Sequence, residues 1–279
     1  MNAVVGSDAY IKVGLIGHPV AHSKSPLIHN YWIKKYGLQG DYTALDIRPE
    51  HFQSTLRQLA KDGFKGLNVT LPFKEQALTL CDVLDNAARQ AGAVNTLVFD
   101  HGKIHGFNTD IFGFTESITE SQPMFDFTQG PAVMLGAGGA AHAVLHALLG
   151  QKTPEIIVTN RTLEKARALA AGHAQVQLVP WEQREDVLSR ANILINTTAL
   201  GLEGKEPLNL SLSSLKRGAV VCDIVYSPLY TPLLRAAQDR GHPVVTGIGM
   251  LLHQARPAFR KWFGVLPDLD TDLMHKVMA

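Results

Sequence analysis

The chain has 279 residues, which is long enough for two domains that each bury their own hydrophobic core. Hydrophobic residues make up 46% and charged residues 18% of it, as in an ordinary soluble globular protein, and 26 basic against 25 acidic residues leave a formal net charge of +1. No global positive field therefore points to nucleic acid or to an anionic membrane, and small-molecule chemistry is the favoured class of function.

The cysteines and the chain start bear on the compartment. Cys81 and Cys222 lie far apart and outside any metal-ligand spacing, which argues for a reducing compartment and against a disulfide framework. The amino terminus has no charged segment followed by a long apolar stretch, and no apolar run reaches membrane-spanning length. We therefore expect a cytoplasmic protein that binds neither nucleic acid nor membrane. As a separate expectation, the protein is a monomer or a homodimer.

The front part of the chain alternates predicted strands and helices, which is typical of an α/β domain. Strands are expected at Ile11 to Ile16, Asp41 to Ile47 and Gly66 to Thr70, with helices from Leu27 to about Gly37, from His51 to Lys61 and from Lys74 to Leu80. Ala93 to Phe99 and Lys103 to Phe107 then flank Asp100-His101-Gly102, a hairpin signal.

Polar side chains follow several of these strands. Ser25 before Pro26 is typical of a helix N-cap followed by a proline at the first helical position. If the preceding loop is extended, Ser23 and Ser25 point to the same side and offer two hydroxyls to a carboxylate. Lys74 opposes the dipole of the helix that it opens, so it is either solvated or held by a site. Asp110 ends the polar loop after the hairpin.

A glycine-rich turn organises the middle of the chain. Residues 132–135 predict a buried parallel strand, and the alanine-rich run up to Gly150 predicts a helix. Between them, Gly136-Ala137-Gly138-Gly139-Ala140-Ala141 fits G-x-G-x-x-A, in which the glycines permit a tight turn and close approach of a pyrophosphate to the helix N-terminus. Glycine-rich turns between a strand and a helix also occur where no ligand binds, so the assignment to a dinucleotide site depends on the strand that follows.

That following strand, Ile156 to Val158, completes a βαβ unit and favours NADP over NAD. NAD-binding versions carry an acidic residue after it, whereas this chain has Asn160 and Arg161, with Lys165 one helical turn further on. Cations suit a 2′-phosphate, which a carboxylate would repel. The alternative is that the two cations are merely a solvated helical turn.

The remaining elements predict a doubly wound sheet. Strands are expected at Val176 to Val179, Asn192 to Asn196, Ala219 to Ile224 and Val244 to Thr246, and helices at Ile111 to Ile118, Thr162 to Ala171, Glu182 to Ser189, Pro232 to Arg240 and from the Gly247-Ile248-Gly249 segment to about Phe263. Thr197 and Tyr226 fall in loops at strand ends, where open α/β sheets bind ligands.

Metal catalysis is the alternative enzyme class. His142 and His146 lie four residues apart on the predicted helix, but the glutamate of H-E-x-x-H is absent and the helix begins at the glycine turn. We expect a surface or hydrogen-bonded pair and no metal.

A series of motifs identifies a family. These are G-H-P-V-A-H-S-K-S-P from Gly17, G-L-N-V-T-L-P-F-K from Gly66, G-A-V-N-T from Gly92, G-F-N-T-D from Gly106, G-A-G-G-A-A from Gly136, N-R-T from Asn160 and G-I-G-M-L-L-H-Q from Gly247. From Gly14 to about Phe263 the chain resembles shikimate dehydrogenases. The resemblance implies an N-terminal substrate domain of residues 1–110 plus 247–279, a Rossmann-like NADP-binding domain of residues 111–246, and a C-terminal helical return to the first domain.

The resemblance also implies roles for individual residues. Lys74 and Asp110 would form the catalytic pair. Substrate would be held at its carboxylate by Ser23 and Ser25 with Tyr226 nearby, and at its ring hydroxyls by Thr70, Asn95 and Gln254. The cofactor would contact Gly136, Ala137, Gly138, Gly139, Ala140, Asn160, Arg161, Thr162, Lys165, Thr197 and Gly247. Lys165 stands where many relatives have arginine, and Thr246 replaces a common aspartate.

The implied reaction is NADPH-dependent reduction of 3-dehydroshikimate to shikimate, in aromatic amino-acid biosynthesis. A lysine ammonium can stabilise and protonate the ketone oxygen, and a neighbouring carboxylate can orient it. Two alternatives remain at this point: a dual quinate/shikimate dehydrogenase that uses NAD or NADP, and a regulator that senses shikimate or dinucleotide without turnover. The pairing of Lys74 with Asp110 argues against the regulator, because a sensor needs no proton donor.

Overall fold

A computed structural model describes residues 9–278. Its described residues divide into two compact units, residues 9–109 with 252–278, and Asp110–Leu251. Each unit contains a six-stranded sheet. The expected lack of a targeting signal concerns residues that lie mostly outside this range. Within the described range, no helix combines the length and the apolar character that crossing a membrane requires.

The sheet of the first unit is mixed, with the strand order β2-β1-β3-β5-β6-β4. Its strands are β1 (Ile11–Gly17), β2 (Gly40–Asp46), β3 (Phe64–Val69), β4 (Val83–Leu84), β5 (Thr96–Asp100) and β6 (Lys103–Phe107). Strands β2, β1 and β3 are parallel, whereas β5 is antiparallel to both β3 and β6. The carboxyl ends of β1, β3 and β6 therefore lie at the same edge as the start of β5.

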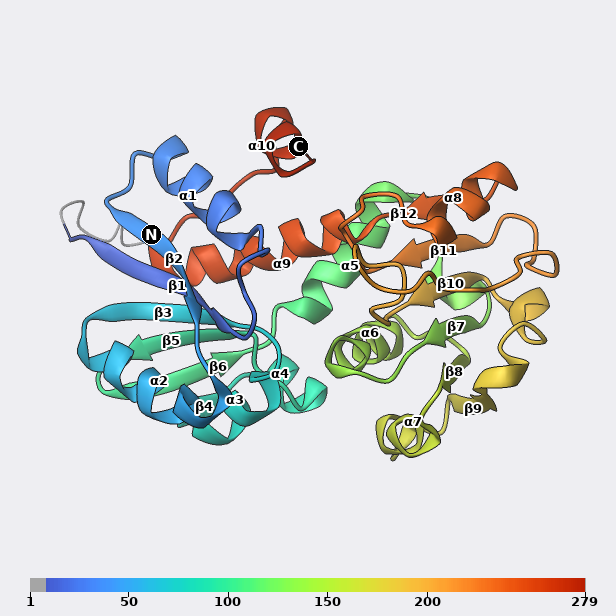
Figure 1. Ribbon diagram of the computed structural model, residues 1–279, viewed down its shortest axis with the longest axis horizontal. Helices are drawn as coiled ribbons and strands as arrows, with labels where there is room; N and C mark the ends of the chain where they lie inside the picture. Colours follow the sequence, from blue (N-terminus) through green and yellow to red (C-terminus); the bar gives the residue numbers. More distant parts are fainter. Residues whose placement is uncertain (1–8, 279) are drawn as a thin grey trace. The chain divides into compact units, whose positions relative to one another are not determined.

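Helices cover both faces of this sheet (Figure 1). The helices of the unit are α1 (Ser25–Lys35), α2 (Phe52–Lys61), α3 (Lys74–Leu80), α4 (Asn86–Ala91), the Leu252–Phe263 part of α9 (Gly247–Phe263), and α10 (Thr271–Met278). On one face, Phe52 of α2 stacks on Phe73 at 4.3 Å between ring centroids, within a core that includes Leu67 and Leu97. On the other face, α1 and α9 contribute an aromatic cluster.

This aromatic cluster comprises His29, Trp32, Tyr42, Phe259 and Trp262. The His29 ring stacks on Tyr42 with 4.2 Å between centroids, and the Trp262 indole N–H donates to the backbone carbonyl of Leu97 at 2.9 Å. Helix α9 therefore packs on the sheet of the first unit, as expected for a C-terminal helix that returns to the first domain.

The last helix, α10, runs antiparallel to α1, which no pattern in the sequence indicated. At one end, the Asp270 carboxylate accepts hydrogen bonds from the Tyr31 hydroxyl and the Lys35 ammonium. At the other end, the Lys24 ammonium donates to the carbonyl of Val277 at 2.6 Å. Because the last carbonyls of a helix lack intrahelical partners, Lys24 also caps α10.

His29 makes this cluster sensitive to acid. Burial lowers the pKa of His29 to about 3, and its ring nitrogens have no hydrogen-bond partner among the described residues. The unfolded chain takes up a proton near the usual pKa of about 6.5, so stability is lost as the pH falls from there toward about 3. We expect His29→Phe to flatten this loss by up to about 1.4 kcal/mol per pH unit. Urea titrations at several pH values measure how the free energy of unfolding changes with pH. His51→Phe replaces an exposed histidine and should keep the pH dependence of the wild type.

The sheet of the second unit is entirely parallel, with the order β12-β11-β10-β7-β8-β9. Its strands are β7 (Ala132–Leu135), β8 (Ile156–Asn160), β9 (Val176–Pro180), β10 (Ile193–Asn196), β11 (Val220–Asp223) and β12 (Val244–Val245). Read from the other edge, the order is that of a Rossmann fold, which reverses direction between β7 and β10. Ligands bind such sheets beyond the strand ends at this point.

Both faces of the parallel sheet are buried, as its apolar strands predict. Met134 of β7 faces a core with α5 (Asp110–Ser121), α6 (Gly139–Gly150) and α7 (Leu163–Ala170). Its neighbour Leu135 faces a second core with α8 (Pro232–Asp239). The expected doubly wound fold is confirmed.

Two local predictions are wrong. Residues 182–189 do not form an α-helix but lie in two 3₁₀ helices, Trp181–Gln183 and Leu188–Arg190, with turns between them. Arg184 donates to the carbonyls of Trp181 and Asn209, and these contacts hold the turn in a form that helix propensity does not anticipate. In addition, Lys24 and not Ser25 is the N-cap of α1.

Candidate active site

One edge of the first sheet collects the predicted substrate residues of that unit. Ser23 and Ser25 follow β1, Thr70 and Lys74 follow β3, and Asn95 directly precedes β5. The register pairs Asn68 with Thr96 and Thr96 with Phe107, so residues 95 and 108 lie just beyond the same edge. The antiparallel β5 brings its start, not its end, to this edge.

The loop that carries Ser23 and Ser25 is stabilised by a hydrogen bond between these two serines. Lys24 has helical backbone angles, φ −82° and ψ −4°, so the loop is not extended and the predicted alternation of the two serines does not apply. Instead, the Ser23 hydroxyl accepts a hydrogen bond from the Ser25 amide at 3.2 Å. Ser23 keeps its proton free to donate elsewhere, and Ser25 is buried at the first residue of α1.

Lys74 is the first residue of α3, as the sequence predicts. Buried Phe73 anchors the turn before it, and the Phe73 amide donates to the carbonyl of Thr70 at 2.9 Å. The Lys74 carbonyl accepts from the amide of Val94 at 2.9 Å, which ties the start of α3 to the segment that carries Asn95. The backbone of a cation at a helix start is therefore fixed from both sides.

Asn95, Thr109 and Gln254 are brought together. The Asn95 side-chain oxygen accepts from the Thr109 amide at 2.9 Å, and its side-chain nitrogen donates to the Thr109 hydroxyl at 2.9 Å and to Gln254 Oε1 at 3.4 Å. Gln254 reaches this group from α9. Asp110, which follows Thr109 in the chain, is buried and begins α5 in the second unit.

In the second unit, the glycine turn has the form that the motif predicts. Gly136 has φ +109°, and a Cβ there would lie 2.6 Å from the Thr197 hydroxyl. Gly138 is exposed and is the N-cap of α6; having no side chain, it leaves the first amides of that helix uncapped by its own atoms. Ala141 is completely buried, so the helix packs closely on β7. These features fit an anionic pyrophosphate.

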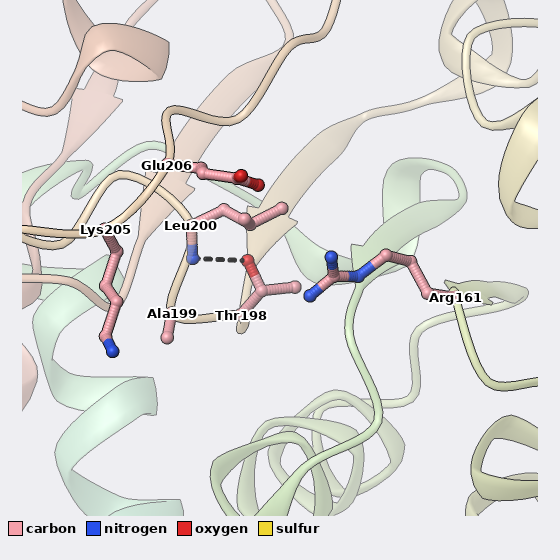
Figure 2. A pocket seen from close by; sticks show the side chains of 6 residues that line it. All are labelled: Arg161, Thr198, Ala199, Leu200, Lys205 and Glu206. Carbon is pink, nitrogen blue, oxygen red and sulfur yellow. Dashed lines mark hydrogen bonds between the residues drawn. The ribbon is translucent and has the colours of Figure 1, made fainter.

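A pocket of about 330 Å³ lies beside Arg161, one of the cations that the sequence predicts to bind the 2′-phosphate of NADP. It is lined by Arg161, Thr198, Ala199, Leu200, Lys205 and Glu206. Figure 2 shows the Arg161 guanidinium extending toward Thr198, whose hydroxyl accepts from the Leu200 amide at 3.1 Å. Of these lining residues, only Arg161 was predicted from the sequence as a contact of the cofactor.

The other predicted cofactor residues differ in how they are placed. Asn160 supports the loop, since its side-chain nitrogen donates to the carbonyl of Thr162 at 2.7 Å. Thr162 and Lys165 are exposed and do not line the pocket. Buried Thr197 donates its hydroxyl to the carbonyl of Leu135, next to the glycine turn. Gly247 begins α9, where a Cβ would lie 2.3 Å from the carbonyl oxygen of Ile224.

Asp223, a residue that the sequence analysis missed, holds two of these loops. It ends β11, and its carboxylate accepts from the side-chain nitrogen of Asn196, the amide of Val225 and the hydroxyl of Thr231. Burial raises its pKa. Asp223 therefore joins the loop after β10, which carries Thr197, to the loop after β11, which carries Tyr226. Burial likewise raises the pKa of the partly buried Tyr226.

His146, one of the two histidines four residues apart on α6, contacts a third histidine, His173. The rings of His146 and His173 meet edge to face at 5.3 Å, and burial lowers the pKa of His146. No group of three or more potential metal ligands occurs within residues 9–278.

Models of known families match most of the chain. Residues 15–97 match the shikimate dehydrogenase substrate-binding domain, residues 119–227 the shikimate/quinate 5-dehydrogenase family, and residues 247–278 the shikimate 5′-dehydrogenase C-terminal domain. These three matches follow the order of the motifs.

Individual relatives agree. A shikimate dehydrogenase (NADP⁺) from Paracoccus denitrificans is 46% identical, with 95% of each chain covered. The crystal structure of shikimate 5-dehydrogenase from Thermus thermophilus in complex with NADP(H) and shikimate is 38% identical, with a TM-score of 0.85 and coverage of 96% and 98%. Quinate dehydrogenase from Corynebacterium glutamicum in complex with NAD is 32% identical, with a TM-score of 0.88 and coverage of 96% and 97%. The chain belongs to the shikimate dehydrogenase family.

Proposed function

We propose that this protein catalyses the reversible, NADPH-dependent reduction of 3-dehydroshikimate to shikimate in aromatic amino-acid biosynthesis. The family membership supports the reaction, and one structural observation supports the site: the edge of the first sheet gathers two serines, a threonine, a lysine and an asparagine from separate strands. That set of hydroxyl, amide and ammonium groups suits a substrate with one carboxylate and several hydroxyls.

The first unit is the substrate-binding domain in this proposal. Ser23 and Ser25 hold the substrate carboxylate, with Tyr226 of the second unit as a further hydroxyl. Thr70, Asn95 and Gln254 hydrogen-bond the ring hydroxyls. The bonds among Asn95, Thr109 and Gln254 support this assignment, because side chains already in contact are preorganised for a polar ligand.

The second unit is the NADP-binding domain. The Gly136–Ala140 turn and the N-terminus of α6 would hold the pyrophosphate, and Thr197 and Gly247 would be further contacts of the cofactor. The 2′-phosphate is held by the loop of Asn160, Arg161, Thr162 and Lys165. Two observations support this placement: the N-terminus of α6 has no side-chain cap, and the Arg161 guanidinium lines a pocket. Glu206 is the one acidic residue among those that line this pocket.

Bound NADPH supplies the hydride that reduces the ketone carbon. As negative charge grows on the ketone oxygen, Lys74 stabilises it and donates a proton from Nζ, which forms the new hydroxyl. Asp110 accepts hydrogen bonds from the lysine and the substrate and so orients both. In the reverse direction, Lys74 takes the hydroxyl proton back, and the proton is exchanged with solvent.

The absorbance of NADPH gives a direct test. Purified protein supplied with shikimate and NADP⁺ should produce NADPH, with a higher kcat/KM than for shikimate with NAD⁺ or for quinate with either cofactor. Shikimate binding with no change in NADPH absorbance would contradict the proposal, and an equal or higher kcat/KM for quinate would assign the protein to the dual-specificity class.

Arg161 should set the preference for NADP. We expect Arg161→Gln to raise the KM for NADP⁺ by about 10- to 100-fold, because a charged hydrogen bond to the 2′-phosphate is worth about 1.5–3 kcal/mol. The KM for NAD⁺ should change little. Arg167→Gln removes the same charge from an exposed position on α7 and is the matched control. Equal losses with the two cofactors would contradict this role.

A further inference from the structure

A second pocket of the second unit lies at the opposite edge of the parallel sheet from the glycine turn. It has a volume of about 290 Å³ and is lined by Arg217, Gly218, Arg240, Gly241 and His242. Residues 217–218 come just before β11, and residues 240–242 lie between α8 and β12, so the pocket is at the amino ends of these two parallel strands. The glycine turn and Thr197 follow the carboxyl ends of β7 and β10 in the same sheet. The pocket is therefore separate from the proposed cofactor site.

The charged side chains that line this pocket are all of one sign. Arg217 and Arg240 are exposed, and neither guanidinium forms an ion pair with a carboxylate within residues 9–278. Arg240 makes one long hydrogen bond, from Nη2 to the Ser213 carbonyl at 3.5 Å. None of the lining residues is acidic. A pocket lined by positive charge alone concentrates anions, so its ligand should be an anion.

Capping of helix α8 does not account for Arg240. An arginine at the end of a helix often interacts with the last carbonyl groups, which lack partners within the helix. Here backbone amides already bond these carbonyls, since the Gly241 amide donates to Gln238 at 2.9 Å and the His242 amide donates to Ala237 at 3.0 Å. The Arg240 guanidinium is therefore available to a group outside the helix.

His242 indicates which kind of anion suits the pocket. Its side chain is buried, and Nδ1 lies 3.2 Å from the carbonyl oxygen of Ala219. A carbonyl oxygen only accepts, so Nδ1 carries the hydrogen, and Nε2 of the neutral ring is an acceptor. Nε2 makes no hydrogen bond with any residue that the structure describes. A ligand that meets Nε2 should therefore offer a hydrogen, in addition to oxygens that accept from the arginines.

A phosphate group meets both requirements. Its oxygens accept paired hydrogen bonds from guanidinium groups, and a phosphate that keeps one proton can donate it to a neutral imidazole. Sulfate has the same shape, and the same charge as hydrogenphosphate, but it carries no proton near neutral pH. We propose that Arg217, Arg240 and His242 form a binding site for a phosphate group, free or on a small metabolite, that is distinct from the proposed dinucleotide site.

Calorimetric titration of the protein with inorganic phosphate near neutral pH tests the site. Arg240→Gln should raise the Kd by about 10- to 100-fold, because it removes charge-assisted hydrogen bonds. Arg235→Gln is the matched control. It removes the same charge from the same helix, but Arg235 bonds the Tyr230 carbonyl and does not line the pocket, so the Kd should stay within about twofold. Sulfate should bind the wild type about two- to tenfold less tightly than phosphate, the equivalent of one hydrogen bond.

Three further results would overturn the proposal. Equal weakening by Arg240→Gln and Arg235→Gln would indicate an effect of overall charge. Loss of phosphate binding in Arg161→Gln, with wild-type binding in Arg240→Gln, would place the phosphate in the dinucleotide site. Absence of phosphate binding to the wild type, or equal affinity for sulfate, would leave the pocket without this ligand.

Titration with glycerol 3-phosphate identifies the source of the phosphate group. Binding tighter than that of inorganic phosphate would indicate a phosphorylated metabolite, and weaker binding would indicate free phosphate. Either result supports the site, provided that Arg240→Gln weakens the binding and Arg235→Gln does not.

Discussion

Replacing Lys74 with methionine should lower kcat for shikimate oxidation by about 10²- to 10⁴-fold, the range found when a general acid or base is removed. Methionine keeps much of the length and apolar stem of lysine but cannot carry a proton. In the reductive direction, the ketone oxygen would then receive its proton only from water, and nothing at this position would balance its growing charge.

The affinity for NADPH, measured by the quenching of protein fluorescence, should not change in Lys74→Met. Lys74 belongs to the substrate edge of the first sheet, and the glycine turn that is proposed to hold the pyrophosphate lies in the second unit. Lys61→Met, at an exposed lysine in the last turn of α2, is the matched control and should retain wild-type turnover.

Asp110→Asn provides a second arm of this experiment. If Lys74 and Asp110 act as a unit, the double variant should be little worse than the worse single one, because groups that work together are not additive. Turnover of Lys74→Met within a few-fold of wild type would remove the lysine from the mechanism. The substrate site would then need another proton donor.

The largest effect on stability is expected from Gly66→Ala. A Cβ at this position would lie 2.1 Å from the carbonyl oxygen of Leu97 and 2.2 Å from Nε1 of Trp262. Those two groups are hydrogen-bonded to each other across the space above Gly66. Neither can retreat easily, since Leu97 is in a central strand and Trp262 is packed in the aromatic cluster.

We therefore expect Gly66→Ala to reduce the free energy of unfolding by about 3 kcal/mol or more, the upper range for overpacking. Proteins of this kind have about 5–15 kcal/mol in total, so soluble yield should also fall. Thermal denaturation followed by circular dichroism measures the loss. Gly150→Ala is the control, because a Cβ there meets open space among the described residues and alanine favours the helix. Equal melting temperatures for the two variants would contradict the packing argument.

Elements with strong local signals could be predicted from the sequence. Helix α3 begins at Lys74 as expected, because Pro72 ends the preceding strand and the residues that follow favour a helix. The parallel order of the second sheet follows from alternating apolar runs and helices around the glycine turn. For α3 the information lies within a few residues, and for the second sheet it lies in a regular alternation of strands and helices along the chain.

Features that depend on distant residues could not be predicted in this way. Tyr42 reads as an ordinary strand residue, and only the fold brings its hydroxyl to Asn68. The same holds for Asp223, whose partners lie before and after it in the chain, and for Arg184, whose contacts with Asn209 replace a predicted helix. Pairing of single polar groups over long separations leaves no periodic pattern.

The closure of the first sheet by α9 has a consequence for biosynthesis. Phe259 and Trp262 cover His29 and Tyr42, yet they are translated more than two hundred residues later. The second unit is one continuous segment, so all of its strands have left the ribosome while the first sheet still lacks this cover. During synthesis, the aromatic face of the nascent chain is exposed until the last helices emerge, and it is there that a chaperone would be needed.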